Sequence, residues 1–498
     1  MIEALPQAIA LVLAPQTLLI GVGAALFGLF VGAMPGLSAT MAVALLVPVS
    51  FFLDPVSALT AVVMTTAMAI FAGDIPAALM RIPGTPASAA YVADAFALSR
   101  QGKAELALGI CLVASAIGGL FGTAVLVLLA PWLAEFALRF SGMEYFWLVA
   151  LGLSCAVLVA GPDPLKGAVG LLVGLFIATI GQDVTSGFPR FTAGIPNLLS
   201  GVSFIPAMVG MFAIAEILRN LPTIRTAAEV QTRRLGSILR GTGSVLRRHP
   251  ANLVRGNVIG TAVGILPGAG ADIAAWISYA VGKRFSREPE RFGNGSEEGL
   301  VDAAAANNAA IAGAWVPALV FGIPGDSVTA IVIGLLLMKG IQPGPDIFLM
   351  NPAQIGAVFL AFVLANLAMI PIGLAAIRLC AKVLLVPRPV LTPLILLFCM
   401  VGSFAIDNDS FALVVMAAMG VLAWAMEENQ VPIAPAILGI VLGEPFEKHF
   451  MTTMMKGEGS LAYFVSRPIA AVLAGITALV WAAILWGLVR RRPRQATA

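Results

Sequence analysis

Long apolar runs dominate this chain and constrain its fold more than any other feature, because very few charges interrupt them. Of 498 residues, 59% are hydrophobic and only 11% are charged, whereas a soluble domain carries about 25% charged residues. So few charges cannot cover the surface of a water-soluble fold of this length. The runs are continuous and do not alternate with a period of two, which argues against a β-barrel. The sequence therefore predicts an all-α polytopic membrane protein.

Neither cysteine nor histidine is arranged for a metal or a redox site. Four cysteines lie inside apolar runs without close pairing, namely Cys111, Cys155, Cys380 and Cys399, as is typical of buried thiols. His249 and His449 lie in polar connections without a partner at ligand spacing. We therefore expect no cofactor and no stably bound metal. The start at Met1, without a basic segment, argues against a cleavable signal peptide.

The longest polar stretch runs from Arg219 to Arg255 and carries eight arginines against one acid, Glu229. The positive-inside rule places such a connection in the cytoplasm. A nucleic-acid-binding patch is the alternative, but no aromatic residues are interleaved with these arginines. The stretch divides the chain into two halves.

The two halves repeat each other. Gly28-Leu-Phe-Val-Gly32-Ala-Met-Pro-Gly36 matches Gly260-Thr-Ala-Val-Gly264-Ile-Leu-Pro-Gly268 at an offset of 232 residues. Further along, Pro76-Ala-Ala-Leu-Met-Arg-Ile-Pro-Gly84 matches Pro317-Ala-Leu-Val-Phe-Gly-Ile-Pro-Gly325 at an offset of 241 residues. Two matches in the same order at nearly equal offsets indicate an internal duplication.

Charges indicate that the repeats are inverted. After the first Pro-Gly segment, half one reaches Asp54 without a cation, whereas half two carries four basic residues within 283–291. After the second segment the bias reverses, with Arg100 and Lys103 in half one and Lys339 alone in half two. Equivalent loops of opposite character predict opposite sides of the membrane, as in many secondary transporters.

Segment lengths predict re-entrant hairpins. Residues 253–266 and 269–282 are about 14 residues each, or roughly 21 Å at 1.5 Å per residue, which is short of a ~30 Å hydrocarbon core. Both ends of this pair are basic, so it should enter from the cytoplasm with Pro267-Gly268 at its tip. Its counterpart, residues 18–52, should enter from the opposite side.

Broken helices and full spans complete the expected topology. Residues 56–98 and 301–338 are predicted to cross with breaks at the Pro-Gly pairs ending in Gly84 and Gly325. Full spans are expected near residues 104–130, 145–161, 164–182, 200–219, 353–377, 390–405, 410–426, 431–443 and 466–489. The prediction is thus about eleven crossings and two hairpins, with a periplasmic N-terminus and a cytoplasmic C-terminus. The expected domains are a first repeat over 1–218, a linker over 219–255, a second repeat over 256–464 and a final helix with a basic tail over 465–498.

The Pro-Gly breaks predict an anion site. A helix that starts after such a break begins with unpaired N–H groups, which attract negative charge. Four such starts carried to mid-depth can converge on one anionic solute. The predicted binding residues near them are Gly36, Ser38, Thr40, Gly84, Thr85, Ser88, Gly268, Gly270, Gly325, Ser327 and Thr329. The alternative is that each motif is only a tight turn with small residues for helix packing.

Polar residues inside the apolar segments are further candidates. Asn307 and Asn308 lie among alanines and contact either the ligand, a cation or a neighbouring helix. Four carboxylates lie near the breaks, namely Asp74, Asp94, Asp272 and Asp326. Asp272, Asn308 and Asp326 are predicted to hold a coupling cation, although Asp326 could merely cap a helix. Asp74 and Arg81, seven residues apart, could instead form a structural pair.

These motifs together resemble the large membrane subunit of the tripartite tricarboxylate transporters. The matching stretches are Gly32-Ala-Met-Pro-Gly-Leu37, Ile82-Pro-Gly-Thr85, Asp94 with Arg100-Gln-Gly-Lys103, Leu266-Pro-Gly-Ala-Gly-Ala271, Asn307-Asn-Ala309, Gly322-Ile-Pro-Gly325 and Gly340-Ile-Gln-Pro-Gly-Pro345. The resemblance implies a bacterial inner-membrane importer of small carboxylates driven by a Na⁺ or H⁺ gradient. It also implies two partners, a small four-helix membrane subunit and a periplasmic solute-binding protein.

The chain departs from the family's usual pattern at three places. Phe71-Ala72-Gly73-Asp74 stands where a Tyr-Gly-Gly-type turn is usual, Ala304 replaces a usual Glu, and Asp326 replaces a small residue. A carboxylate position has therefore moved, which bears on the substrate and on the coupling ion.

Two other function classes are weaker alternatives. An intramembrane enzyme would need a nucleophile with a base or a metal cluster, and the histidines lie outside the apolar segments. A channel would not need inverted broken helices around a closed site. The sequence contains no Walker-type loop, so we do not expect ATP hydrolysis by this chain.

The inverted arrangement can be tested by labelling. In a cysteine-free version, single cysteines introduced at Asp54 and Arg284 should react with a membrane-impermeant reagent from opposite sides of the membrane. Labelling of both positions from the same side would contradict the inverted repeat.

Overall fold

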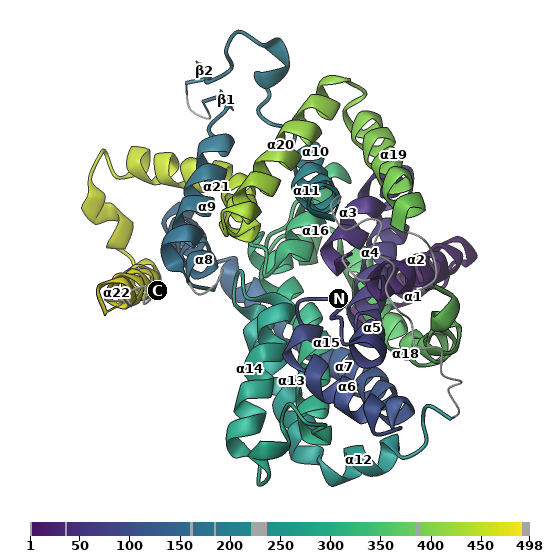
Figure 1. The fold of residues 1–498 in the computed structure, drawn as a ribbon. Coiled ribbons are helices and arrows are strands. Elements are labelled where there is room, and N and C mark those ends of the chain that lie inside the picture. Colours follow the sequence, from purple (N-terminus) through teal and green to yellow (C-terminus); the bar gives the residue numbers. More distant parts are fainter. Residues whose placement is uncertain are drawn as a thin grey trace, which may run out of the picture. The chain divides into compact units, whose positions relative to one another are not determined.

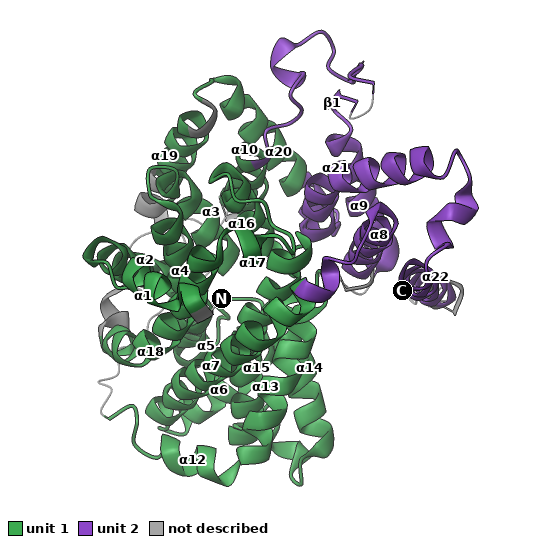
Figure 2. Cartoon of the chain, turned by 180° about the vertical axis from the view of Figure 1, so that it is seen from behind, with its two compact units in different colours: residues 1–134, 205–424 green, residues 135–204, 425–498 purple. Residues whose placement is uncertain are grey.

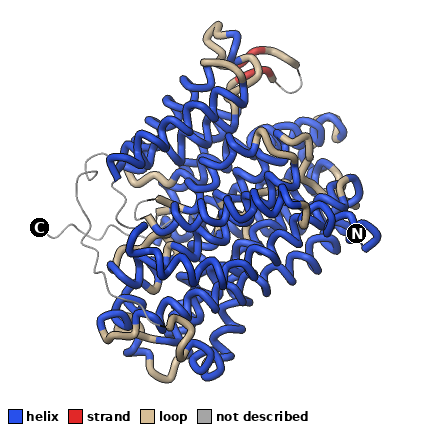
Figure 3. Tube along the Cα trace, turned by 90° about the vertical axis from the view of Figure 1, so that its right-hand side faces the viewer, coloured by secondary structure: helices blue, strands red, loops and turns tan. Residues whose placement is uncertain are grey.

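The protein is almost entirely helical, as the sequence predicts. The computed structural model describes residues 2–34, 37–159, 163–183, 186–220, 237–383 and 388–490. Helices make up nearly all of this, and a short antiparallel pair, β1 (Gly181–Gln182) and β2 (Pro189–Arg190), is the sheet found in the described residues (Figure 3). Residues 221–236 of the predicted basic linker (219–255) lie outside the described residues.

The chain forms two compact units, each built from two separate segments (Figure 2). Unit 1 comprises residues 1–134 and 205–424, and unit 2 comprises residues 135–204 and 425–498. The repeat boundaries expected from the sequence concern internal duplication and stay a prediction.

Unit 1 contains the Pro-Gly motifs, and Figure 1 labels many of its helices. Its elements in the first segment are η1 (Ile2–Ala4), α1 (Leu5–Val12), α2 (Pro15–Ala33), α3 (Ala39–Ser50), α4 (Pro55–Ala72), α5 (Asp74–Met80), η2 (Ser88–Ala90), α6 (Val92–Arg100) and most of α7 (Ala104–Ala137). Its elements in the second segment are α10 (Phe204–Val209), η4 (Gly210–Ile214), α11 (Ala215–Asn220), α12 (Thr242–Arg248), α13 (Pro250–Ile265), α14 (Gly270–Phe285), η6 (Pro289–Arg291), α15 (Glu297–Phe321), α16 (Ser327–Met338), α17 (Ile347–Met350), α18 (Pro352–Val383), α19 (Arg388–Asp407) and most of α20 (Phe411–Glu428).

Local capping signals set where the main helices begin. The Asp54 side chain accepts the Ser57 N–H at 3.0 Å, and Pro55 follows it at the first helical position of α4. Ser296 caps α15 in the same way by accepting the Gly299 N–H at 3.0 Å. Such caps satisfy N–H groups that the helix cannot pair internally, and each contributes about 1 kcal/mol.

Helices α4 and α15 form the centre of unit 1. The apolar window of the span Pro55–Met80, which begins with α4, is 100% buried, and that of α15 is 94% buried, whereas the corresponding window of α2 is only 50% buried. Each central helix makes its most extensive contact with one neighbour, α4 with α2 and α15 with α13.

The two central pairs are built on equivalent glycines. A Cβ atom added at Gly28 or Gly32 of α2 would lie 2.4 Å from the Thr65 carbonyl oxygen or 2.2 Å from that of Ala69, on α4. The same close approach occurs in half two. Small residues at every fourth position allow backbones to approach this closely, as in membrane helix dimers.

In half two, Gly260 and Gly264 of α13 approach the carbonyl oxygens of Ala306 and Ala310 on α15, at 2.3 and 2.4 Å from an added Cβ. The offset between glycines of the two halves is 232 residues and that between their contacts is 241 residues, the same two offsets as in the sequence. The duplicated motifs therefore build the same helix packing twice. Opposite orientation of the two copies across a bilayer stays a prediction.

Unit 2 is a smaller group of helices. Its elements are α8 (Gly142–Val159), α9 (Pro164–Ala178), β1, β2, η3 (Pro196–Leu198), α21 (Ile433–Lys456), η7 (Leu461–Val465) and α22 (Pro468–Arg490). Helices α9 and α21 touch at Gly174, where an added Cβ would lie 1.9 Å from the Ala436 carbonyl oxygen. The buried carboxylate of Glu144 pairs with Arg467 at 3.2 Å.

Seven described helices are long and apolar enough to cross a membrane, and several shorter apolar helices accompany them. Many large apolar side chains on these helices are exposed, including Leu19, Leu128 and Leu479. Such a surface suits contact with lipid chains and not with water. The prediction of a polytopic membrane protein is confirmed.

The paired glycines yield a stability prediction. Gly260→Ala should lower the free energy of unfolding by about 1–3 kcal/mol, because the new methyl group meets backbone atoms of α15 that cannot move aside. Gly23→Ala is the matched control, since an added Cβ there has no atom within 4 Å, and alanine is the better helix former by about 1 kcal/mol. Thermal unfolding in detergent measures both; equal midpoints for the two variants would contradict the close packing.

Candidate functional site

Each Pro-Gly motif falls in the interval between two helices. The breaks follow α2, α5, α13 and α15. Pro35 and the predicted site residue Gly36 lie outside the described residues. The other three motifs are described completely, and we call the loops around them the first-half tip (residues 81–88), the hairpin tip (266–272) and the second-half tip (322–329).

The first-half and second-half tips have the same backbone path. Arg81 adopts φ 58° and ψ 25°, and its equivalent, Gly322, adopts φ 67° and ψ 22°. The next residue in each tip, Ile82 or Ile323, donates its N–H to the carbonyl of the proline at the start of the motif, at 3.4 and 3.2 Å. The second sequence repeat is therefore also a structural repeat.

Two reciprocal hydrogen bonds stabilise the C-terminal end of the first-half tip. The Thr85 N–H donates to Ser88 Oγ at 3.2 Å, and the Ser88 N–H donates to Thr85 Oγ1 at 3.3 Å. Both side chains are buried. The Gly84 N–H donates to the Gly73 carbonyl at 3.1 Å, and a Cβ on Gly84 would lie 2.5 Å from Gly73 Cα.

The second-half tip has the equivalent arrangement with a carboxylate in it. The Thr329 N–H donates to Asp326 Oδ1 at 2.7 Å, and the Asp326 N–H donates to Thr329 Oγ1 at 2.8 Å. This is a capping box at the start of α16, which satisfies two N–H groups reciprocally. Asp326 is thus a helix cap, and it is also half-buried at the tip. Gly325 is buried, and Ser327 is half-buried beside it.

Three of the tips meet. Asp272, at the start of α14, accepts the Ala87 N–H at 3.2 Å, which joins the hairpin tip to the first-half tip. A Cβ on Gly270 would lie 2.6 Å from Asp326 Cβ, which places the hairpin tip against the second-half tip. Gly268 and Gly270 have φ of 83° and 57°, a conformation that glycine adopts without strain.

Two predicted residues of the first hairpin, Ser38 and Thr40, lie at the start of α3. Ser38 caps this helix by accepting the Met41 N–H at 3.1 Å, and Thr40 is half-buried in its first turn. Helix α3 packs against α16, just as η2 packs against α14. Helix α3 of half one therefore contacts α16, which follows the second-half tip. Helix α14 of half two contacts η2, at the end of the first-half tip.

Arg81 brings positive charge to the first-half tip. It is exposed, and among the described residues no carboxylate lies within ion-pair distance of it. Asp74 does not form the structural pair considered from the sequence; its Oδ1 instead accepts a hydrogen bond from Tyr91 at 2.5 Å. A non-glycine residue in the left-handed conformation costs about 1–3 kcal/mol. Half one therefore carries a cation, Arg81, at the position where half two has glycine, Gly322.

Asn307 and Asn308 are buried inside unit 1. The Asn307 Nδ2 donates to Tyr91 Oη at 3.4 Å, and the Asn308 Nδ2 contacts Met369 Sδ at 3.7 Å. Both lie on α15, and the side-chain oxygen of each has no hydrogen-bond partner among the described residues. Their roles as ligand or cation contacts stay predictions.

Comparison with known proteins identifies the family. The tripartite tricarboxylate transporter TctA family matches residues 18–438, which is most of the chain. The chain belongs to this family. It is 34% identical over 451 residues to an uncharacterized 52.8 kDa protein in the TAR-I ttuC' 3' region of Agrobacterium vitis, covering 91% of this chain and 89% of that one.

A second relative from Agrobacterium vitis, an uncharacterized protein in the TAR-II ttuC' 3' region, is 35% identical over 217 residues, covering 44% of this chain and 90% of that one. No solved structure matches the chain. The TctA family is one of transporters, so the chain is a tricarboxylate transporter large subunit and a multi-pass membrane protein.

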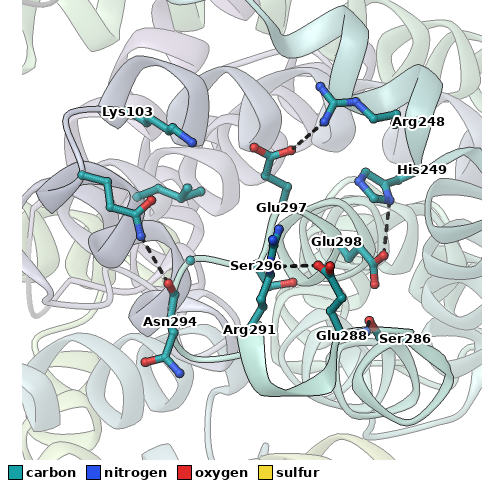
Figure 4. Close-up of a pocket in the computed structure, with 13 residues that line it drawn as sticks. Lys103, Arg248, His249, Ser286, Glu288, Arg291, Asn294, Ser296, Glu297 and Glu298 are labelled. Carbon is teal, nitrogen blue, oxygen red and sulfur yellow. Dashed lines mark hydrogen bonds and ion pairs between the residues drawn. The ribbon is translucent and has the colours of Figure 1, made fainter.

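Figure 4 shows a polar pocket of this TctA protein whose lining includes no residue of the three tips. It has a volume of about 440 Å³ and lies between the start of α15, the end of α12 and the loop after α6. Ion pairs cross its wall, His249 with Glu298 at 3.5 Å and Arg291 with Glu288 at 2.8 Å. None of the site residues predicted from the sequence lines it.

Metal-binding groups do not cluster in the described part of this TctA protein. No set of three or more His, Cys, Asp or Glu side chains there is arranged to share a metal ion. Asp94, another of the carboxylates near the breaks, is used structurally: its Oδ1 accepts N–H groups of Gly293, Gly295 and Ser296, each at 2.8 Å, and Tyr279 donates to its Oδ2 at 2.6 Å.

Sequence reasoning missed Tyr91. It lies between an alanine-rich loop and α6, it is fully buried, and its hydroxyl contacts both Asp74 and Asn307. Tyr91 follows Ser88, the last residue of the first-half tip, by three residues. This closeness to the tip was the signal in the sequence that could have identified Tyr91. Nothing in local spacing indicates that Asn307, more than 200 residues later, would contact it.

Two substitutions of Asp326 separate its cap from its charge. Asp326→Ala should lower the free energy of unfolding by about 1 kcal/mol, because the Thr329 N–H loses its acceptor. Asp326→Asn should leave stability nearly unchanged, since asparagine caps helices as well as aspartate does. Thermal unfolding of both purified variants tests this. Equal destabilisation by the two changes would show that the negative charge, and not the cap, is what α16 requires.

Proposed function

We propose that this chain is the permease subunit that moves a small carboxylate across the bacterial inner membrane, driven by a cation gradient. The substrate would be a tricarboxylate, a dicarboxylate or a related organic acid. A periplasmic solute-binding protein would deliver it, and a small four-helix membrane subunit would assemble with the chain. The N-terminus would be periplasmic and the C-terminus cytoplasmic.

The meeting of three tips is the observation that supports carboxylate binding most directly. The helix α14 begins at Gly270 without a side-chain cap in the part of the chain that the structure describes, so its first N–H groups are open to an anion. The half-buried Ser327 hydroxyl and the exposed Arg81 guanidinium lie on the neighbouring tips. Backbone N–H groups, hydroxyls and one arginine suit a carboxylate.

The charges at the tips support coupling to a cation. Asp272 and Asp326 lie close enough for their charges to act on each other, and a bound carboxylate would add a further negative charge. Two neighbouring carboxyl groups resist being ionised at the same time. A Na⁺ or H⁺ that enters with the substrate would relieve the repulsion, with Asn308 as a further oxygen donor for Na⁺. No ATP hydrolysis is needed for such a cycle.

The repeated frame supports alternating access. Two copies of one helix-and-tip arrangement, facing opposite sides, would open the same site to each side in turn, as in other transporters with inverted repeats. The tip-bearing unit 1 would provide this frame, because it contains both copies.

Uptake in cells tests the proposal. Cells that carry the chain with its binding protein and small subunit should accumulate radiolabelled citrate or a radiolabelled dicarboxylate, and collapse of the ion gradients should abolish accumulation. Cells without the chain are the control. If no organic acid in a panel of tri- and dicarboxylates is taken up in a gradient-dependent way, the proposed transport is wrong.

Arg81 provides a variant within the same assay. Arg81→Gly should reduce uptake by about 10- to 100-fold, because a charge-assisted hydrogen bond contributes about 1.5–3 kcal/mol, yet it should keep or raise the thermal stability by removing left-handed strain. Arg81→Lys keeps a positive charge and should retain more uptake than the glycine variant. Undiminished uptake by Arg81→Gly would remove this residue from the site.

A further inference from the structure

A buried polar cluster lies directly behind the first-half tip. It consists of Asp74, Tyr91 and Asn307, which we call the Asp74 cluster, and all three residues have 0% exposure. Tyr91 donates its hydroxyl proton to Asp74 Oδ1 at 2.5 Å and accepts the Asn307 Nδ2 proton at 3.4 Å. Asp74 belongs to an apolar stretch long enough to span a membrane, Pro55–Met80.

The Asp74 carboxyl has no charge partner. Its second oxygen, Oδ2, has no hydrogen-bond partner among the described residues, and neither does the side-chain oxygen of Asn307. The titratable groups that face Asp74 are the Tyr91 hydroxyl and the Cys111 thiol of α7. Both groups are neutral while they keep their protons. No arginine or lysine of the described chain forms an ion pair with it. A buried carboxylate whose only neighbouring donors are neutral, the Tyr91 hydroxyl and the Cys111 thiol, is costly, so this site suits a carboxyl group that carries a proton.

The duplicated fold does not require a carboxyl here. At the offset of 241 residues that relates the two tips, Asp74 corresponds to Trp315 and Tyr91 to Val332. Trp315 and Val332 are both fully buried. Half two thus has neither a carboxyl nor a hydroxyl group at these positions: Trp315 lies inside α15 and Val332 inside α16, whereas Asp74 begins α5 and Tyr91 precedes α6. A role in packing alone does not explain why half one keeps an unpaired buried carboxyl and its tyrosine.

The Asp74 cluster is tied to the first-half tip at both ends. Gly73, the residue before Asp74, accepts the Gly84 N–H at 3.1 Å, and a Cβ on Gly73 would lie 2.7 Å from Thr85 Cγ2. Tyr91, at the other end, donates its N–H to the Ser88 carbonyl at 3.3 Å. The hydrogen bond between Asp74 and Tyr91 therefore closes the loop that carries the tip.

We propose that Asp74 is the proton-binding residue through which this transporter couples proton entry to carboxylate binding at the tips. The proposal rests on the proposed uptake function and names its coupling ion. An O–H bond forms at Asp74 Oδ2 when the site faces the periplasm, and it breaks when the site faces the cytoplasm, where the proton leaves. One proton is carried inward through this site in each cycle, and no electron transfer or other reactant is involved.

The coupling follows from the geometry of the loop. The Asp74–Tyr91 and Gly73–Gly84 hydrogen bonds hold Asp74 against the loop that carries the tip. Protonation of Asp74 removes its negative charge and therefore lowers the repulsion of an anion bound at the tip. Loss of the proton restores the charge and weakens anion binding. Proton and carboxylate therefore promote each other's binding, as reciprocal linkage requires.

The proton itself can be observed without transport. Infrared difference spectra of the purified full-length chain, recorded as the pH is raised, should contain the carbonyl band of a protonated carboxyl group that disappears on titration. Asp74→Asn should lose one component of this carbonyl band. Asp163→Asn is the matched control, because it makes the same chemical change at a helix cap in unit 2, and it should keep the band. A carbonyl band in Asp74→Asn that is as intense as that of the unmodified chain would overturn the proposal, whatever the outcome of uptake.

Transport provides the second arm. Proteoliposomes that contain the complete transporter should accumulate a radiolabelled carboxylate identified by the uptake panel when an inward proton gradient is imposed. Asp74→Asn should lose this accumulation but still exchange internal for external substrate. Accumulation that follows an imposed sodium gradient and ignores the proton gradient would overturn the assignment of the proton, whereas the uptake function would stand. Absence of transport by the unmodified chain would instead contradict the uptake function while the infrared result still decides the proton site.

Discussion

Direct contact between helix backbones is the constraint on which the rest of unit 1 depends. Lipid chains are as apolar as the helices, so close van der Waals packing, and not the exclusion of water, must hold membrane helices together. Gly28 and Gly260 meet this need by letting α2 lie against α4 and α13 against α15. The same contact places the tips: a Cβ on Gly84 would lie 2.7 Å from the Gly32 carbonyl oxygen, so the end of α2 supports the first-half tip.

Much of this arrangement follows from the sequence, and the rest has a definable reason. The apolar runs predict the helices, and the duplicated motifs predict equivalent breaks, which the left-handed Arg81 and Gly322 reproduce in the backbone. Contacts between distant side chains are not encoded in local spacing. The Asp272 bond to Ala87 and the Asn307 bond to Tyr91 each join residues more than 180 positions apart. Local patterns therefore identify the tips but not which tips touch.

The first-half and second-half tips share a backbone conformation but differ in charge. Arg81 stands opposite Gly322, and the neutral Thr85 stands opposite Asp326, while both tips keep the same reciprocal hydrogen bonds. Duplication thus supplies the frame, and divergence at a few positions supplies its chemistry. Since the caps and chain reversals are satisfied by either residue, these positions are free to differ without loss of the fold.

The discontinuous makeup of unit 2 has a consequence for biosynthesis. Residues 135–204 leave the ribosome long before residues 425–498, because all of 205–424 lies between them. At about 5–20 residues per second, that delay is roughly 10–45 s. During this interval α8 and α9 must reside in the bilayer without α21. The surface of α9 at Gly174, which packs against Ala436 in the folded protein, stays uncovered until α21 has been translated.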